Sequence, residues 1–135
     1  MLIGYTTGTF DMFHVGHLNI LRSARAMCDK LIVGVSTDEI LVYKGRKCII
    51  PLSQRIEVVR GIKYADVVIP QYDINKVTAY HKLKYDILFV GDDWHATPQW
   101  DNYEKDLAYY GVKIVYFPRT VHVSTTQIIE KIKNE

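Results

Sequence analysis

The stretch Gly8-Thr9-Phe10-Asp11-Met12-Phe13-His14-Val15-Gly16-His17 stands between an apolar run, Leu2–Thr7, and a helical pattern that begins near Leu18. It brings two glycines, two imidazoles and a carboxylate into the turn from a strand to a helix. In open α/β folds, ligands bind in the crevice at the carboxyl ends of the strands. The stretch therefore predicts both the fold class and the place of a ligand site.

Composition excludes several classes of protein. The 135 residues carry a net charge of +2, which is too small for bulk binding of nucleic acid. Cys28 and Cys48 form neither a disulfide framework nor a metal-ligand spacing. The apolar runs are too short to span a bilayer, and the first residues carry no export signal. We therefore expect one domain over residues 1–135, located in the cytoplasm.

Strand-like and helix-like segments alternate along the chain. The expected strands are Leu2–Thr7, Lys30–Ser36, Asp66–Pro70, Asp86–Asp92 and Val112–Phe117. The expected helices are Leu18–Met27, Ser53–Tyr64 with Ser53 as its N-cap, Asn75–Lys84, Asn102–Tyr110 and a last helix capped by Ser124. Between them, Thr37–Leu52 is expected to be a loop. This order predicts an α/β fold with a five-stranded parallel sheet and helices on both faces.

The glycine- and histidine-containing turn carries residue types suited to nucleotidyl transfer. Such a transfer adds negative charge to the α-phosphate oxygens, and imidazole N–H groups and helix N-terminal amides stabilise that charge. Gly16 lets the backbone approach a phosphate closely. His14 and His17 lie three residues apart, so both rings can face one phosphate. A phosphomonoester acceptor is largely dianionic near neutral pH, so no protein nucleophile is needed.

The same stretch resembles the G-T-F-D-x-x-H-x-G-H signature of the cytidylyltransferase family, within the nucleotidylyltransferase superfamily, at every fixed position. The resemblance covers essentially the whole chain and implies a single Rossmann-like domain, commonly a homodimer. It implies CTP, Mg²⁺ carried by CTP, and a small phosphorylated alcohol as reaction partners. The resemblance also implies that His14 and His17 stabilise the transferring phosphate, while Thr9, Phe10 and Val15 help to form the nucleotide pocket.

A second element lies between the last expected strand and the last helix. Arg119-Thr120-Val121-His122-Val123-Ser124-Thr125-Thr126 resembles the family's R-T-x-G-I-S-T-[TS] element, with His122 in place of the glycine. Arg119 offers a planar fork for phosphate oxygens, and the hydroxyls and amides at a helix start attract anions. A plain serine N-cap is the alternative. The resemblance assigns all eight residues to the nucleotide and gives Arg119 a catalytic role as well.

Gly91-Asp92-Asp93-Trp94 closes the fourth expected strand and resembles the G-D-D-W of the members that act on glycerol 3-phosphate. The resemblance assigns Gly91, Asp92 and Trp94 to the nucleotide, although two aspartates after a strand are also ordinary loop chemistry. It favours sn-glycerol 3-phosphate as the acceptor. CDP-glycerol, a precursor of cell-surface polysaccharide, and pyrophosphate would then be the products.

Further substrate-binding residues come from the same resemblance. Lys44 matches a family lysine that contacts substrate and is expected to be catalytic, and Arg46 suits a triphosphate. The expected acceptor ligands are Asp11, Asp38, Lys44, Arg55, Lys63, Asp66 and Lys76. Lys63 stands where glycerol-type members carry arginine, and this change loses bidentate geometry.

Three alternatives remain open from the sequence. Asp11, His14 and His17 have spacings that could chelate a metal ion. The acceptor could be phosphocholine, phosphoethanolamine, another polyol phosphate or a phosphorylated amino acid. The chain could also be a nucleotide-binding module without catalytic activity.

Overall fold

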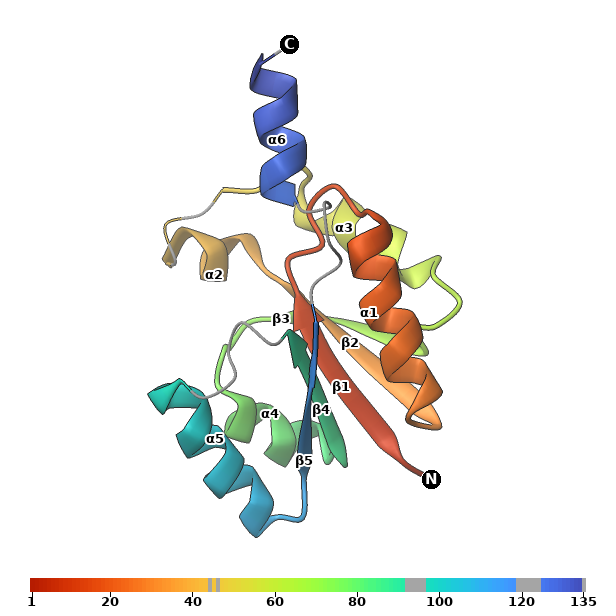
Figure 1. Ribbon diagram of the computed structural model, residues 1–135, viewed down its shortest axis with the longest axis vertical. Coiled ribbons are helices and arrows are strands. Elements are labelled where there is room, and N and C mark those ends of the chain that lie inside the picture. Colours follow the sequence, from red (N-terminus) through yellow and green to blue (C-terminus); the bar gives the residue numbers. More distant parts are fainter. Residues whose placement is uncertain (44, 46, 92–96, 119–124, 135) are drawn as a thin grey trace.

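The computed structural model describes residues 1–135 except 44, 46, 92–96, 119–124 and 135. Five strands form one parallel sheet in the order β3-β2-β1-β4-β5 (Figure 1). The strands are β1 (Ile3–Gly8), β2 (Lys30–Ser36), β3 (Val67–Gln71), β4 (Ile87–Gly91) and β5 (Lys113–Phe117). The predicted α/β fold with a five-stranded parallel sheet is confirmed.

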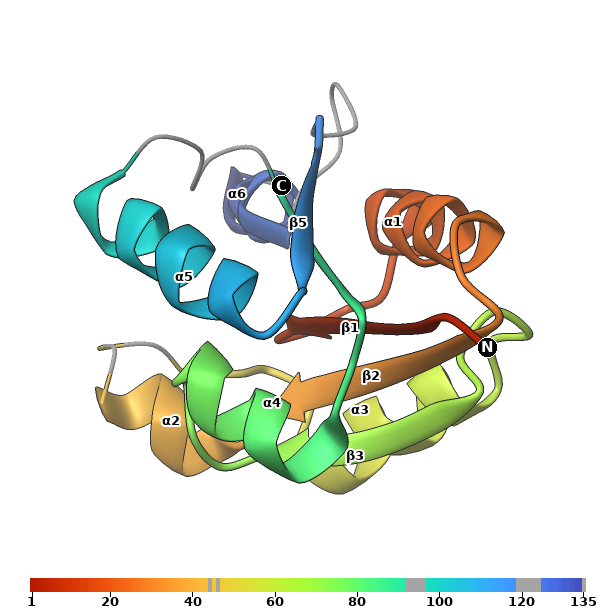
Figure 2. The same cartoon turned by 90° about the horizontal axis from the view of Figure 1, so that it is seen from below.

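Helices cover both faces of this sheet (Figure 2). One apolar cluster packs α1 (Val15–Ala26) and α3 (Leu52–Arg60) on one face, through the fully buried Leu21 and Val59. A second cluster packs α4 (Lys76–Leu83) and α5 (Pro98–Tyr109) on the other face, around Leu88 and Leu107. The remaining helices are α2 (Asp38–Tyr43) and α6 (Thr125–Asn134). Within the described residues, no helix combines the length and apolarity needed to cross a membrane.

Three expectations for the segment between β2 and β3 are wrong. The expected loop contains α2, whose start is fixed because the Thr37 hydroxyl accepts the amide of Ile40 at 3.4 Å. Ser53 is not an N-cap, because α3 begins one residue earlier, at Leu52, and follows Pro51. The fixed φ of proline suits a helix start even without a side-chain cap. The helix then ends at Arg60 rather than at Tyr64, with Gly61 as its C-cap.

Two other helices begin earlier than the sequence pattern predicts. The side chain of His14 accepts the amide of Gly16 and caps α1. Thr97 caps α5 by accepting the amide of Trp100, with Pro98 in the first turn, where its missing N–H costs nothing. Ser124 lies outside the described residues, and α6 begins at Thr125.

The carboxyl edge of the sheet opens between β1 and β4. The pairing of β1 with β2 continues to Gly8 and Val35, whereas the pairing of β1 with β4 ends at Thr6 and Phe89. At this last pair, the Thr6 hydroxyl donates to the Phe89 carbonyl at 3.0 Å. Strands β1 and β4 flank the point at which the strand order reverses, where ligands bind in doubly wound folds.

Candidate active site

The turn after β1 has a strained backbone. Phe10 and Met12 have φ values of 53° and 50°, in the left-handed region that side chains other than glycine rarely adopt. Phe10 is buried and its ring contacts those of Phe13 and His17. A Cβ on Gly8 would lie 2.9 Å from the Phe10 ring, so glycine is needed at that position. The surrounding contacts therefore hold the turn in one unusual conformation.

The two histidines form a capping box at the start of α1. The Nδ1 atom of His14 accepts the amide of Gly16 at 3.0 Å, and the Nδ1 atom of His17 accepts the amide of His14 at 3.2 Å. Their rings stack with centroids 3.9 Å apart. Because each Nδ1 atom accepts a hydrogen bond, the proton of each neutral ring lies on Nε2. The pair therefore has two Nε2–H donors beside the helix N-terminus.

Burial keeps both rings neutral. It lowers the pKa of His14 below the ordinary value of 6.5. Burial and then the neighbouring His14 lower the pKa of His17 to about 4, and the charge of Asp11 opposes this in part. A protonated Nδ1 atom could not accept an amide hydrogen, so the neutral state and the cap support each other. The rings can thus stabilise an anion through N–H dipoles rather than through a full positive charge.

Asp11 connects the turn to the segment that precedes α3. Its buried carboxylate accepts the backbone amides of Ile49 and Ile50 at 3.0 and 2.9 Å. These contacts fix the segment that follows Lys44 and Arg46, two residues outside the described part of the chain. The geometry favours a positioning role for Asp11, and direct binding of an acceptor stays a prediction.

Arg55 is fully buried and connects three segments at the carboxyl edge. Its Nε atom donates to the carbonyl of Ile50 at 2.9 Å, and its Nη1 atom donates to the carbonyls of Thr9 and Ser36, both at 2.8 Å. Its Nη2 atom forms an ion pair with the Asp38 carboxylate at 2.7 Å. Four of the five guanidinium hydrogens are thus directed at protein acceptors. This arrangement also favours a positioning role, and acceptor binding by Arg55 and Asp38 stays a prediction.

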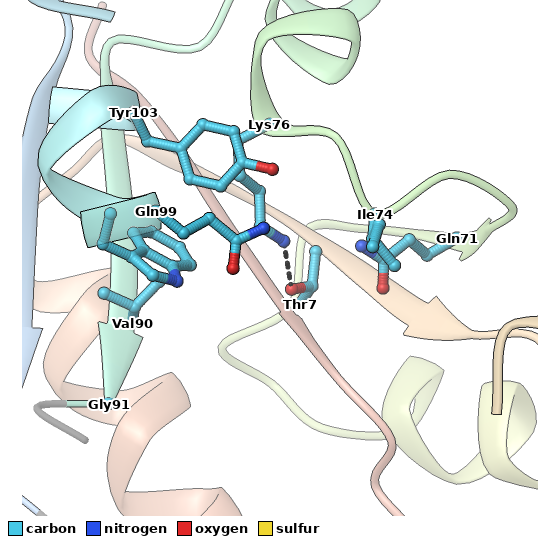
Figure 3. Close-up of a pocket in the computed structure, with 9 residues that line it drawn as sticks. Thr7, Gln71, Ile74, Lys76, Val90, Gly91, Gln99 and Tyr103 are labelled. Carbon is cyan, nitrogen blue, oxygen red and sulfur yellow. Dashed lines mark hydrogen bonds between the residues drawn. The ribbon is translucent and has the colours of Figure 1, made fainter. Parts of the chain in front are cut away.

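A pocket of about 170 Å³ lies at the carboxyl ends of β1, β3 and β4 (Figure 3). Lys76, only 7% exposed, donates from Nζ to the Thr7 hydroxyl at 2.8 Å. Helices α4 and α5 both begin at this pocket, so their N-terminal amides add to the positive potential there. The residues that line it are Thr7, Gln71, Ile74, Lys76, Val90, Gly91, Gln99, Trp100 and Tyr103. This combination suits a small anionic ligand.

A family model described as cytidylyltransferase-like matches residues 5–131. The chain belongs to the cytidylyltransferase-like family. Its sequence is 35% identical to the glycerol-3-phosphate cytidylyltransferase of Staphylococcus aureus, over 94% of this chain and 92% of that protein. The chain is therefore a nucleotidyltransferase of this family.

Other similar proteins carry different names and match different shares of this chain. An ethanolamine-phosphate cytidylyltransferase of Arabidopsis thaliana is 34% identical over 95% of this chain, but over only 31% of its own length. An FAD synthase of Archaeoglobus fulgidus is 37% identical over 70% of this chain. A crystal structure of a lipopolysaccharide core biosynthesis protein from Thermoplasma volcanium superposes with a TM-score of 0.74 over 89% of this chain and 97% of that protein. At 22% identity, this likeness shows the shared fold alone.

The structure brings part of the predicted family site together. Thr9, Phe10, His14, Val15, Gly16 and His17 lie in the turn and the first turn of α1, and Lys76 and Gly91 line the pocket. The other predicted nucleotide or catalytic residues, Lys44, Arg46, Asp92, Trp94, Arg119, Thr120, Val121, His122, Val123 and Ser124, lie outside the described residues. Thr125 and Thr126 begin α6, and their side chains are not described. The roles of all these residues stay predictions.

Lys63 and Asp66 are not brought to this site. Asp66 precedes β3 at the amino edge of the sheet, where its carboxylate accepts the amide of Leu31 at 2.7 Å and pairs with Arg25 at 2.9 Å. The Lys63 ammonium lies 5.1 Å from the ring centroid of Tyr64, in the same connection. The fold thus separates both residues from the histidine pair by the length of a strand.

The alternative metal site is not formed by the described side chains. Among these residues, no three histidine, cysteine, aspartate or glutamate side chains are grouped to hold a metal ion. His14 and His17 use their Nδ1 atoms in the helix cap, and Asp11 uses both carboxylate oxygens to accept amides. These atoms therefore serve the protein backbone rather than a chelate.

Sequence reasoning missed most of the pocket wall. Gln71 ends β3, and Gln99 and Tyr103 belong to the first turns of α5. The available signal was the two-residue period of the strands, which places Thr7 and Gln71 on the same face as the apolar residues before them. A polar side chain at the carboxyl end of such an apolar row indicates a ligand-facing position.

Proposed function

We propose that this chain transfers a cytidylyl group from CTP to sn-glycerol 3-phosphate, giving CDP-glycerol and pyrophosphate. The observation that carries the proposal is the nearly end-to-end match to the glycerol-3-phosphate cytidylyltransferase of S. aureus, over 94% of this chain and 92% of that protein. The ethanolamine-phosphate relative is matched over only 31% of its length. The match over nearly the full length of both proteins, together with the pocket at Lys76, supports a small polyol phosphate as the acceptor.

The site contains groups suited to an in-line displacement at phosphorus. An oxygen of the acceptor phosphate attacks the α-phosphorus of CTP, and the bond from that phosphorus to the bridging oxygen of the β-phosphate breaks. Pyrophosphate leaves with the electron pair. The Nε2–H groups of His14 and His17 donate to the α-phosphate oxygens as their negative charge grows. Mg²⁺ is expected to enter bound to the phosphates of CTP and to neutralise part of the charge on the leaving group.

The pocket at Lys76 is proposed to hold the acceptor. Its volume of about 170 Å³ is below the roughly 300–1,000 Å³ that is usual for drug-sized ligands, so it favours a short alkyl phosphate over a flavin-sized acceptor. Among the described lining residues, Lys76 is a cation and none is a carboxylate. An ammonium headgroup such as that of phosphoethanolamine would thus be repelled by Lys76 and lack a counter-charge on this wall. Action as a homodimer that supplies cell-surface precursors is proposed from the family resemblance alone.

An acceptor panel tests the proposed function. The purified chain is incubated with CTP, Mg²⁺ and one acceptor at a time: glycerol 3-phosphate, phosphoethanolamine, phosphocholine or FMN. Pyrophosphate release and the CDP-linked product are measured, with ATP as the competing nucleotide. We expect the highest kcat/KM for CTP with glycerol 3-phosphate. A higher value with another acceptor, or with ATP, would overturn the proposal.

A variant of Lys76 tests the assignment of the pocket. Replacing a charge-assisted hydrogen bond costs about 1.5–3 kcal/mol, so Lys76→Met should lower kcat/KM for the acceptor by about 10- to 100-fold. The KM for CTP should stay near its wild-type value. A rise in the KM for CTP with an unchanged KM for the acceptor would instead assign Lys76 to the nucleotide.

A further inference from the structure

Gln71, on the wall of the pocket, has a side chain with a fixed orientation and no role in the proposed transfer reaction. In β3, Val67 and Ile69 belong to the apolar cluster beneath α4 and α5, and Gln71 follows them on the same face. Gln71 is only 6% exposed, although its side chain is polar and lines the pocket. A buried amide at the end of an apolar row calls for a hydrogen-bonding partner.

The neighbouring strand fixes the amide of Gln71. Ser36 is its register partner in β2, and the Ser36 hydroxyl donates to the Oε1 atom of Gln71 at 3.0 Å. The backbone amide of Thr37 donates to the Gln71 carbonyl at 3.1 Å. With Oε1 held by Ser36, the Nε2 atom is the part of the amide that remains for a ligand. Within the described residues, no hydrogen bond from this Nε2 atom to a protein group is found.

Gln71 lies across the pocket from α5. Figure 3 shows Gln71 and Ile74 on one side, Gln99 and Tyr103 on the other, and Thr7 and Lys76 between them. If Lys76 binds the phosphate of a phosphorylated alcohol, the carbon chain of that alcohol would lie between these two walls. A neutral amide donor suits a neutral hydroxyl oxygen on that skeleton.

We propose that Gln71 is a specificity-determining residue, whose Nε2 atom donates to a hydroxyl oxygen of a polyol phosphate held at Lys76. The inference rests on the proposed function and adds the chemical group that selects the acceptor. A site built to hydrogen-bond a hydroxyl group discriminates strongly against the analogue that lacks it, because its buried polar group is then left unpaired. Ser36 acts through Gln71 as a positioning residue.

The experiment compares glycerol 3-phosphate with n-propyl phosphate, which has the same carbon chain without hydroxyl groups. The wild-type chain should prefer glycerol 3-phosphate in kcat/KM. Gln71→Leu should lower this preference by about tenfold or more, mainly through slower reaction of glycerol 3-phosphate. Ser36→Ala, which retains the amide but releases its orientation, should lower the preference less. The KM for CTP should stay unchanged in both variants.

Gln54→Leu, the same chemical change on the exposed surface of α3, is the matched control and should keep the wild-type preference. The proposal is overturned if Gln71→Leu retains the wild-type preference, or if it lowers kcat/KM equally for both phosphates. Failure of the proposed function has a different signature, because the wild-type chain would then transfer no cytidylyl group to glycerol 3-phosphate.

Discussion

At the amino edge of the sheet, carboxylates complete the backbone hydrogen bonding, whereas at the carboxyl edge a histidine pair caps α1 and a lysine lines a pocket. Three carboxylates, each close to a strand start, accept amides at 2.7–2.8 Å, in the pairs Asp29 with Leu2, Asp86 with Ile3 and Asp66 with Leu31. At the opposite edge, His14 and His17 direct Nε2–H groups outward from the cap, and Lys76 lines the pocket.

The two edges of the sheet therefore have different roles: the amino edge stabilises the fold, and the carboxyl edge also carries the groups proposed for the chemistry. The carboxylates at the amino edge bind protein amides, so they stabilise the fold and leave little for a ligand. At the carboxyl edge, Asp11 and Arg55 bind protein groups in the same way, but they hold a strained turn that precedes the histidine pair. Substitutions at the amino edge should therefore change stability alone, whereas substitutions at the carboxyl edge should change stability and activity together.

The largest effect is expected for His17→Ala. Removing one donor to a developing oxyanion typically lowers kcat by about 10²- to 10³-fold. One of the two hydrogen bonds of the capping box, from the His14 amide to the His17 ring, is lost as well, which should lower the free energy of unfolding by about 1 kcal/mol. Pyrophosphate release and urea unfolding measure the two effects separately. A kcat near the wild-type value would remove His17 from the chemistry.

Arg55→Ala should have the largest effect on stability. Three carbonyls, one of them buried, and the Asp38 carboxylate would lose their donor, so the free energy of unfolding should fall by about 3 kcal/mol or more. The KM values for CTP and for the acceptor should rise together, because the turn and the segment before α3 lose their connection. Wild-type stability with a higher KM for the acceptor alone would instead make Arg55 an acceptor ligand.

Asp66→Asn tests the amino edge. The variant weakens the hydrogen bond to the Leu31 amide and the ion pair with Arg25, so the free energy of unfolding should fall by about 1 kcal/mol. Both kcat and the KM for the acceptor should stay at their wild-type values. A weaker affinity for the acceptor at unchanged stability would return Asp66 to the binding site, as the sequence had predicted.

The last prediction concerns the dependence of stability on pH. His17 has a pKa of about 4 in the folded chain and the ordinary value of 6.5 when unfolded. Below pH 6.5 the unfolded ring binds a proton that the folded ring does not, so stability decreases as the pH falls from 6.5 toward 4. Urea unfolding should show this decrease in the wild type and a weaker one in His17→Ala. Equal slopes in the two proteins would contradict the lowered pKa.

The sequence predicted the sheet because its signals are local. The apolar run Leu31–Val35 predicts a buried strand from a few neighbouring residues. The glycine- and histidine-containing turn predicts a strand-to-helix connection in the same way. The start of α3 was missed because Ser53 resembles a cap, while the chain uses Pro51. Local patterns allow a helix to start after either residue, and only the path of the backbone decides which of the two is used.

The site was less predictable because its geometry is not local. Arg55 reaches the carbonyl of Thr9, which is 46 positions earlier in the chain, so its burial could not be read from its neighbours. Lys63 and Asp66 follow Arg55 closely, yet α3 carries the chain to the other edge of the sheet. Gln71 acquires its fixed amide only through the register of β3 with β2.

The most direct test identifies the oxygen atom that forms the new bond to the α-phosphorus of CTP. Glycerol 3-phosphate labelled with ¹⁸O in its phosphate is incubated with CTP, Mg²⁺ and the purified chain, and the product is analysed by ³¹P NMR. Attack by the acceptor phosphate predicts CDP-glycerol with ¹⁸O in the bridge between its two phosphorus atoms, and unlabelled pyrophosphate. A bridge without the label, or no CDP-glycerol at all, would contradict the account.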